Sequence, residues 1–279
     1  MSVHAPDCLP LSLTRGIAQF PIANCPLAQH HGALPGAAAL TVHPHAWISP
    51  EDLADFLTSG AVTLVDAGAA ALAWRGAVAD GASVWVAARS FLIRYAWDLL
   101  RANEQHIAAL AGEVLAGEVH RSVVIEGVVR IGPGTRVLPG VVIEGNVVIG
   151  AGCKIGPNCY LRGNTSIGDH CHIGQAVEIK NSLILSHSQV GHLSYVGDSV
   201  LGEHVNFGAG TITANFRHDG ATHRSAVRGV LVDTGRLKFG CIAGDRVHTG
   251  IHTAIYPGRK LWPGTTTRPG DIVQRDLIF

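Results

Sequence analysis

The chain has 279 residues, of which 47% are hydrophobic and 15% charged, and its formal net charge is zero. This length and apolar content suffice for a buried core in one or two domains, and the absence of a basic surplus argues against nucleic acid as a partner. No stretch approaches the roughly 20 apolar residues that span a bilayer, and the start of the chain lacks a charged segment followed by an apolar one. We therefore expect a cytoplasmic protein without a membrane partner.

Residues 1–120 are expected to form a small α/β region. The stretch ISPEDLADFLTSG predicts a short helix that begins at Ser49 or Pro50. AVTLVDA and SVWVAA are typical of short strands, and SFLIRYAWDLLRANEQHIAALAGEV has the apolar spacing of an amphipathic helix. We expect this region to pack on the open end of the domain that follows.

A repeat of six residues governs the next part of the chain. A branched aliphatic residue occupies every sixth position, at Ile125, Ile131, Val137, Ile143, Ile149, Ile155, Leu161, Ile167, Ile173 and Ile179. Period six fits neither an α-helix nor a strand with one wet face. It predicts a mainly β fold, a parallel β-helix of hexapeptide repeats over residues 121–279, in which each side of a three-sided coil is one hexapeptide.

The repeat frame shortens twice and is interrupted once. It continues at Ile184, Val190, Val196, Leu201, Phe207 and Thr213, with five-residue steps before Ile184 and Leu201. It is lost over residues 214–242, which we expect to leave the coil as a loop or arm, and it returns at Ala243. At 18 residues a coil, about seven coils are expected. Cysteines 153, 159 and 171 fall in the inward column of small residues, which predicts packing, and all six cysteines are expected as free thiols.

Residues 18 apart lie one above the other in such a coil. Arg162 and Lys180 therefore share a column, and the repulsion between two neighbouring cations predicts an anion beside them. The shortened side places Gly197 next in this column and Tyr195 beneath Glu178. With His192 in the coil between, these side chains are expected at one edge. This edge is either an anion site beside an acid/base histidine or a solvated polar edge.

The segment VEIKNSLILSHSQVGHLSYVGDSVLGEHVNFGAGTITANF carries a resemblance to a known family. Its E-x-K, G-H-L-S-Y-x-G-D and N-F-G-A-G-T-I-T-x-N motifs resemble the acetyltransferase domain of bifunctional sugar-1-phosphate nucleotidyltransferase/glucosamine-1-phosphate acetyltransferases. The resemblance covers roughly residues 125–276. It implies left-handed coils, a homotrimer with sites between subunits, and acetyl transfer from acetyl-CoA to the amine of an amino-sugar 1-phosphate.

The resemblance also implies roles for individual residues. His192 falls on the general base, with Glu178 placed to orient it and Asn215 near the reacting centre. The sugar-phosphate substrate is assigned to four positions, which are Arg162, Lys180, Tyr195 and Asn206. Ala209 falls near the acetyl-CoA thioester, and Arg224 or Arg217 stands where the family has lysines. No metal is implied.

Two fragments of the amino-terminal part resemble the nucleotidyltransferase domain of the same family. FPIANCPLAQHH is similar to its P-x-x-N-x-P-x-x-x-H segment, and YAWDLLRANEQHI to its W-D-L-L-x-A-N-E helix. The glycine-rich G-x-G-T-R loop that cradles a triphosphate is absent from residues 1–120 of this sequence. We therefore expect residues 1–120 to be a truncated nucleotidyltransferase-like region without nucleotidyl transfer.

Other functions remain open at this point. A non-catalytic sugar-phosphate-binding or regulatory β-helix would keep the same fold. A sugar-1-phosphate nucleotidyltransferase is a further alternative. A zinc enzyme of the γ-carbonic anhydrase type would use His187 and His192, but its remaining ligand is expected near position 151, which is alanine.

Overall fold

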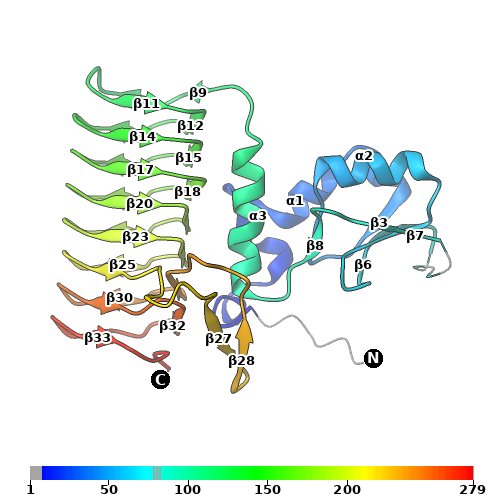
Figure 1. Ribbon diagram of the computed structural model, residues 1–279. Helices are drawn as coiled ribbons and strands as arrows, with labels where there is room; N and C mark the ends of the chain where they lie inside the picture. The colour runs from blue at the N-terminus through cyan, green and yellow to red at the C-terminus, as the bar shows by residue number, and fades with distance from the viewer. Residues whose placement is uncertain (1–7, 78, 80, 82, 279) are drawn as a thin grey trace.

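The computed structural model describes residues 8–77, 79, 81 and 83–278, and its main feature is a three-sided parallel β-helix (Figure 1). Each coil contributes one short strand to each of three faces, which we call A, B and C in chain order. Face A contains β9 (Val114–Leu115), β12 (Val129–Ile131), β15 (Val147–Ile149), β18 (Thr165–Ile167), β21 (Leu183–Ile184), β24 (Val200–Leu201), β29 (Cys241–Ala243) and β32 (Arg259–Leu261).

Face B contains β10 (Glu118–Val119), β13 (Arg136–Val137), β16 (Lys154–Ile155), β19 (His172–Ile173), β22 (Gln189–Val190), β25 (Asn206–Phe207) and β30 (His248–Thr249). Face C contains β11 (Val124–Glu126), β14 (Val142–Glu144), β17 (Tyr160–Arg162), β20 (Glu178–Lys180), β23 (Tyr195–Gly197), β26 (Ile212–Thr213), β31 (Ala254–Ile255) and β33 (Ile272–Val273). The faces thus stack eight, seven and eight strands, in agreement with the expected number of coils.

The strand register follows the six-residue frame. Leu161 pairs with Ile179 at the full spacing of 18, and Ile179 pairs with Val196 at a spacing of 17, where a shortened side was predicted. After the interruption, Leu201 pairs with Ala243. The frame residues are buried in one continuous core, which removes their apolar surface from water and holds the coils together. The predicted fold class is thereby confirmed in its hexapeptide β-helix and in the small α/β region that precedes it.

The three cysteines in the inward column also behave as predicted. Cys153, Cys159 and Cys171 are buried in the β-helix core. Burial raises the pKa of the Cys159 thiol to about 11, because the thiolate would lose its hydration there. These cysteines are therefore packing residues.

The amino-terminal region consists of short helices and small sheets. Its elements are 3-10 turns at Leu11–Leu13, Ile17–Gln19 and Ala37–Ala39, β1 (Pro21–Ile22), β2 (Cys25–Pro26), α1 (Leu27–Gly32), β3 (Leu40–Val42), β4 (Ala46–Trp47), α2 (Pro50–Ser59), β5 (Thr63–Val65), β6 (Ala71–Arg75), β7 (Val84–Val86), β8 (Phe91–Leu92) and α3 (Ala96–Ala108). The predicted helix at residue 50 is confirmed, since the Ser49 hydroxyl caps α2 by accepting from the Asp52 amide.

The expectation that this region packs on the open end of the coil is wrong. Helix α3 runs along the stack and lies against face A, with the rest of the region on its far side (Figure 1). The reason is that face A turns apolar side chains outward: Leu183, Leu185, Val200 and Ile242 bury themselves against the apolar side of α3 and its neighbours. The helix that covers this stripe removes its apolar surface from water.

Two polar side chains hold the amino-terminal region to the β-helix, one from each of the two fragments that resemble the nucleotidyltransferase domain. Asn24, in the P-x-x-N segment, donates to the Ile167 carbonyl at 2.7 Å. Asn103, fully buried in α3, accepts from the Ser166 hydroxyl at 2.9 Å and donates to the Asn164 carbonyl. These motif residues therefore hold the two parts of the chain together.

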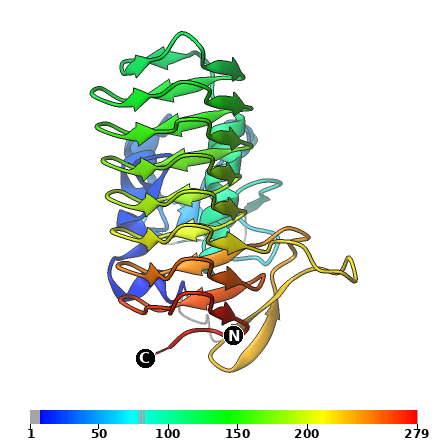
Figure 2. The ribbon, with the colours of Figure 1, turned by 90° about the vertical axis from the view of Figure 1, so that its left-hand side faces the viewer.

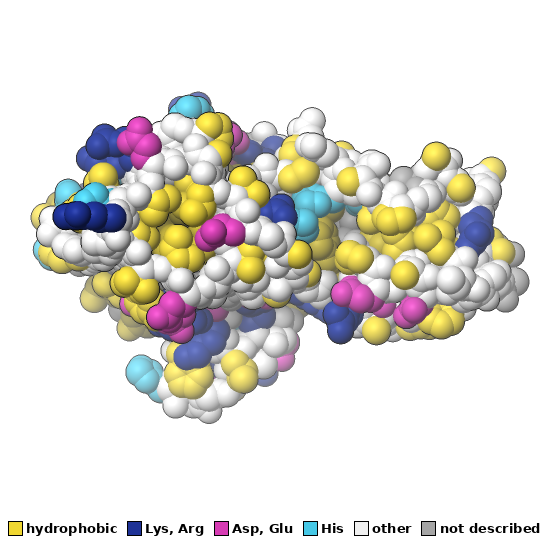
Figure 3. Space-filling model, turned by 90° about the horizontal axis from the view of Figure 1, so that it is seen from above, with side chains coloured by type: hydrophobic (Ala, Val, Ile, Leu, Met, Phe, Trp, Pro, Cys, Tyr) yellow, Lys and Arg dark blue, Asp and Glu magenta, His cyan; other side chains and the backbone are white. Residues whose placement is uncertain are grey.

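The excursion leaves the coil after β26 and forms a hairpin of β27 (Arg224–Val227) and β28 (Val230–Asp233) before the chain rejoins face A at β29 (Figures 1 and 2). At the opposite end, the first coil carries exposed apolar residues, Val114, Leu115 and Val124. The view from above shows hydrophobic side chains among the polar ones on this side of the molecule (Figure 3). The longest helix, α3, has 13 residues, and none of the described helices is long and apolar enough to cross a membrane.

Candidate functional site

Face C carries the predicted column of cations. Arg162 pairs directly with Lys180 in adjacent strands, and Lys180 pairs with Gly197, while Glu178 pairs with Tyr195. The stacking expected from the spacing is therefore present. The two cations stand one strand spacing apart, about 4.8 Å, on the outward side of β17 and β20.

Each cation already has a carboxylate of its own. The Arg162 guanidinium donates to Glu178 Oε1 from Nε and Nη2, at 2.8 and 2.7 Å, and this hydrogen bond raises the pKa of Arg162. The Lys180 ammonium lies 2.9 Å from Asp198 Oδ2. The negative charge that two neighbouring cations require is therefore supplied, in part, by Glu178 and Asp198. Glu178 contacts Arg162, and its carboxylate stands outward on face C.

Asp198 is the centre of a hydrogen-bond network below the cations. Its side chain is only 2% exposed, and it accepts from Asn181 Nδ2 at 2.9 Å and from Asn215 Nδ2 at 2.6 Å in addition to Lys180. The Asn215 amide also donates to the Tyr195 hydroxyl at 2.9 Å. Burial is the main cause that raises the pKa of Tyr195, followed by the charge of Asp198, so the hydroxyl stays protonated at neutral pH.

This network continues into the amino-terminal region and the excursion. Asn181 donates its amide to Glu104 Oε1 of α3 at 2.6 Å, and Arg236, which follows the hairpin, forms an ion pair with the same carboxylate. The Glu104 and Arg236 side chains are 22% and 15% exposed. Helix α3, face C and the excursion therefore meet beside the predicted phosphate-binding lysine.

His192 lies at the corner between faces B and C, three residues before Tyr195, whereas the two cations stand at the other end of the face C strands. It is exposed, in the turn that joins β22 to β23, one residue before Leu193, which has a φ of 57°. In the described part of the chain its imidazole has no hydrogen-bond partner. Its charge contributes, after burial and Lys154, to a lowered pKa of His172 on face B. The ring is therefore accessible, and the expected bond from Glu178 is not formed in this structure.

Of two further predicted residues, Ala209 lies at the same corner and Asn206 lies on face B, three residues before it. Asn206 on face B pairs with Gln189 in one neighbouring coil and with His248 in the other. Three residues after Gln189, Asn206 and His248 stand His192, Ala209 and Ile251, in that order. The backbone hydrogen bonds show the same stacking of the three corner residues. The Gly210 amide donates to the His192 carbonyl, and the His252 amide donates to the Ala209 carbonyl. His192 and Ala209 thus stand in neighbouring coils of one corner.

Arg224 lies apart from this group. It starts β27, where it pairs with Asp233 across the hairpin, and its side chain is exposed. Arg217, the other arginine of the excursion, forms an ion pair with Asp219. Within the described residues neither arginine contacts His192 or Ala209 in a single chain.

The histidines of the zinc alternative lie at different corners. His187 stands at the corner between faces A and B, where its ring stacks between those of His170 and His204, with centroids 5.1 and 4.8 Å away. His192 is at the corner between faces B and C. Among the residues that the structure describes, no group of three or more His, Cys, Asp or Glu side chains is arranged to hold a metal ion.

Sequence reasoning missed Asp198, Asn181, Glu104 and Arg236. A signal for the first two existed, because each corner needs a residue with positive φ, and Asn181 and Asp198 have φ values of 46° and 50°. Asparagine and aspartate tolerate this conformation better than other non-glycine residues. Glu104 and Arg236 are 132 residues apart, and only the docking of α3 brings them together.

Fold and site together define a hexapeptide-repeat β-helix with a cationic column and an exposed histidine. Residues 143–257, which include the candidate residues from Arg162 to Arg224, match the family model described as GMPPB C-terminal domain. The resemblance extends to curated proteins over about two thirds of this chain. A bifunctional sugar-1-phosphate nucleotidylyltransferase/acetyltransferase of Sulfurisphaera tokodaii is 41% identical over 183 residues, which cover 66% of this chain and 46% of that protein.

A second relative, named bifunctional protein GlmU, from Methanococcus maripaludis, is 48% identical over 185 residues, or 66% of this chain and 44% of that protein. The chain therefore spans about half the length of the curated relatives it matches. Among solved structures, AntD, an N-acyltransferase from Bacillus cereus, matches 57% of this chain and 70% of its own at 15% identity, with a TM-score of 0.26. That similarity is too low to support an inference. The curated relatives confirm the resemblance to the bifunctional nucleotidyltransferase/acetyltransferases.

Proposed function

We propose that this chain transfers an acetyl group from acetyl-CoA to the amine of an amino-sugar 1-phosphate of the glucosamine-1-phosphate type. The observation that carries the proposal is the pairing of Arg162 with Lys180 on face C, one corner away from the exposed imidazole of His192. Two adjacent cations suit a phosphate dianion, and a neutral imidazole suits the amine that must lose a proton. Relatives named for both nucleotidyl and acetyl transfer support the same chemistry.

In the proposed reaction the thioester supplies the activated acyl group. The amine nitrogen attacks the carbonyl carbon, the C–N bond forms, and the C–S bond breaks. His192 takes the proton that the amine loses and returns it to the departing thiolate, so no covalent enzyme intermediate is needed. Tyr195, held by Asn215, and Asn206 are proposed to contact the sugar, and Glu178 to steady Arg162 and the charged imidazole.

The donor is proposed to lie along the corner between faces B and C. Ala209 has a small side chain, and Ile251 in the next coil is exposed, so this corner offers an uncharged surface to the thioester arm. Arg224 is proposed to reach a donor phosphate, and because it lies on the projecting hairpin, we assign this contact to a neighbouring subunit's site.

A homotrimer is part of the proposal. Leu193, Ile212, Ile251 and Ile272, which we call the corner strip, are exposed apolar residues on face C and its corner with face B. Because α3 and its neighbours occupy face A, the corner strip is the apolar side of the coil that a second copy can cover. The strip borders His192, so such contacts would complete the site.

Two further assignments are narrower proposals. The cytoplasm suits a chain in which Cys25, Cys153, Cys159, Cys171 and Cys241 are free thiols. Nucleotidyl transfer is not proposed for this chain, since residues 1–120 carry no G-x-G-T-R loop.

The test is a thiol-release assay with acetyl-CoA and a matched set of acceptors. Glucosamine 1-phosphate is expected to release thiol and gain one acetyl group by mass spectrometry. Glucosamine, which lacks the phosphate, should react poorly, and N-acetylglucosamine 1-phosphate, whose amine is blocked, should not react. Binding of amino-sugar phosphates without thiol release from any of them would support the non-catalytic alternative and contradict the proposal.

A further inference from the structure

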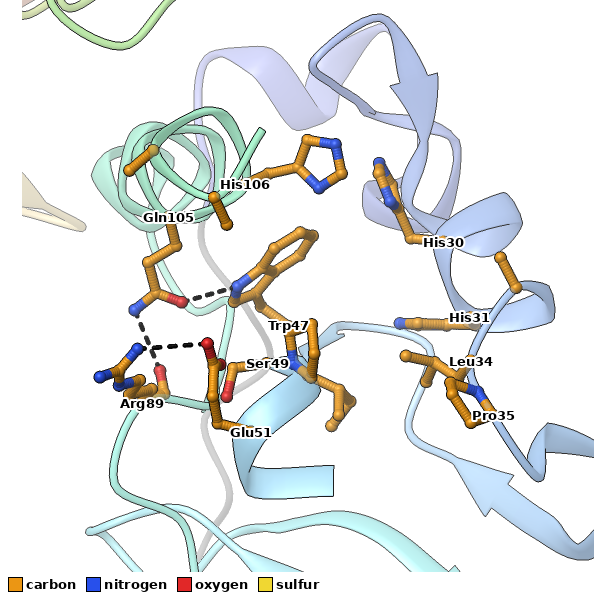
Figure 4. Close-up of a pocket in the computed structure, with 15 residues that line it drawn as sticks. His30, His31, Leu34, Pro35, Trp47, Ser49, Glu51, Arg89, Gln105 and His106 are labelled. Atoms are coloured by element: carbon orange, nitrogen blue, oxygen red, sulfur yellow. Dashed lines mark hydrogen bonds and ion pairs between the residues drawn. The ribbon is translucent and has the colours of Figure 1, made fainter. Parts of the chain in front are cut away.

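A cavity of about 560 Å³ lies in the amino-terminal region and shares no lining residue with the candidate acyl-transfer site. It opens to the surface and is lined by residues of α1 and the turn after it, of β4 and the start of α2, and of the end of α3, and no residue of the β-helix lines it (Figure 4). This volume is in the range of pockets that hold small organic ligands, about 300–1,000 Å³, and far exceeds the voids of an ordinary packed core.

Aromatic rings form much of the cavity wall. His30 from α1 and His106 from α3 face each other edge to face, with ring centroids 4.8 Å apart, and Trp47 lies 5.4 Å from His30 (Figure 4). Leu34 and Pro35 close the side below His31. A flat ring that enters this space meets aromatic faces and edges as well as aliphatic groups, which is the arrangement that aromatic pairs favour.

The hydrogen-bonding groups of the wall are mainly acceptors. His30 Nε2 lies 3.0 Å from the Ile22 carbonyl, and His31 Nε2 lies 2.7 Å from the Ala46 carbonyl. A ring nitrogen in contact with a carbonyl must carry the proton, so in each neutral ring Nδ1 is left as an acceptor. The Trp47 N–H is already used, because it donates to the Gln105 side chain at 2.8 Å.

The two charged residues that line the cavity, Arg89 and Glu51, neutralise each other. Burial lowers the pKa of His31, and burial together with the charges of His30 and Arg130 lowers that of His106 to about 4, so both rings are neutral near pH 7. Arg89 and Glu51 lie at the rim, where they pair with each other at 3.3 Å and are more than half exposed. A phosphate or carboxylate would thus lose its hydration without gaining a counter-ion.

From this geometry we propose that the cavity binds a small uncharged aromatic molecule that carries an N–H or O–H donor. The donor faces Nδ1 of His30 or His31, and the ring lies against Trp47 and His106. The proposal is independent of acyl transfer, since the cavity shares no residue with the candidate site on face C. It assigns to the amino-terminal region a binding function besides its docking on face A.

Indole and 1-methylindole form a matched pair of probes, because they share the ring system and differ in the N–H donor. Titration calorimetry of the full chain is expected to show saturable one-to-one binding of indole. Binding of 1-methylindole should be weaker by about fivefold or more, since it leaves a buried acceptor without a partner. Nitrogen NMR of the imidazoles should show a shift of Nδ1 in His30 or His31 with indole alone.

A cavity-filling variant locates the binding. Ala109→Trp places a large side chain at the cavity edge, whereas Ala54→Trp adds the same side chain to the exposed part of α2 outside the cavity. We expect Ala109→Trp to abolish indole binding and Ala54→Trp to leave it unchanged. Three results would overturn the proposal: no saturable indole binding, equal affinity for the two probes, or unchanged binding in a folded Ala109→Trp variant.

Discussion

The ammonium group of Lys180 lies 2.9 Å from the carboxylate of Asp198, a side chain that is buried at the corner between faces C and A. Asn181 and Asn215 donate to the same carboxylate. The position of the lysine is therefore set from the coil below it, and its neighbour Arg162 is held separately by Glu178. Two cations can stand side by side on face C because each has its own buried or half-buried counter-charge.

Asp198→Asn is expected to destabilise the fold by about 2–3 kcal/mol, because it leaves the partly buried Lys180 without its counter-charge and removes an acceptor for two amides. Asparagine tolerates the φ of 50° at this position, so backbone strain does not contribute. Urea unfolding measures the change. The control is Asp219→Asn, which breaks an exposed ion pair with Arg217 and should not alter stability measurably. Equal effects of the two variants would contradict this description of the network.

Glu104 is expected to act on the substrate site from α3, through Asn181 and Asp198. Glu104→Gln should raise the KM for the amino-sugar phosphate about threefold with little change in kcat, against about tenfold or more for Lys180→Ala, because a charge-assisted contact is lost outright only in the lysine variant. Steady-state kinetics separate the two parameters. Lys154→Ala, on exposed face B, is the control, and a fall in kcat alone for Glu104→Gln would argue against a positioning role.

The stability of the amino-terminal region should fall as the pH drops from about 6.5 to about 4. His106 is neutral and half-buried when folded, with a pKa of about 4, whereas an unfolded histidine titrates near 6.5. The unfolded state therefore binds more protons in this window, so stability rises with pH there and is lost on acidification. His106→Gln should reduce this pH dependence by about 2–3 kcal/mol across the window.

Chemical denaturation at pH 7.5 and pH 4.5 gives this difference for the parent chain and the variant. The same substitution at His218, which is exposed in the excursion, controls for the loss of a titratable group. If the free energy of unfolding of His106→Gln depends on pH as strongly as that of the parent chain, protonation of His106 is not the cause of the acid destabilisation.

The proposed trimer depends on the corner strip. Ile251, which is 51% exposed, is expected to be buried between subunits, so Ile251→Glu should convert the trimer to a monomer, because an unpaired charge is costly in an apolar interface. Light scattering coupled to size-exclusion chromatography measures the mass. Leu13→Glu makes the same change at an exposed position of the amino-terminal region and should leave the mass unchanged. A parent chain that is monomeric at micromolar concentration would refute the trimer.

Much of the β-helix could be predicted from the sequence, because its inward residues repeat at a fixed spacing and every coil is local in the chain. The pairing of Arg162 with Lys180 and of Glu178 with Tyr195 followed from counting alone. The helix at residue 50 followed from its cap at Ser49. These features depend on neighbours in sequence or on one repeated unit.

The position of the amino-terminal region could not be predicted in the same way. It depends on outward-facing residues of face A such as Leu183 and Val200. The six-residue repeat fixes the inward residues only, so it does not indicate which outward face is covered. The role of Asp198 as a counter-charge could not be predicted, because an aspartate at a corner of positive φ can equally be solvated. The contact of Glu104 with Arg236 joins segments that only the docked fold brings together.

The central claim is that His192 serves as the base in acetyl transfer. Its side chain is exposed and has no side-chain partner among the described residues, so His192→Ala should leave folding and subunit assembly intact. With acetyl-CoA and glucosamine 1-phosphate, thiol release by this variant is expected to fall by about 100-fold or more, the usual contribution of a general base. His187→Ala, at another corner, should keep full activity. Unchanged thiol release by a folded His192→Ala variant would contradict the account.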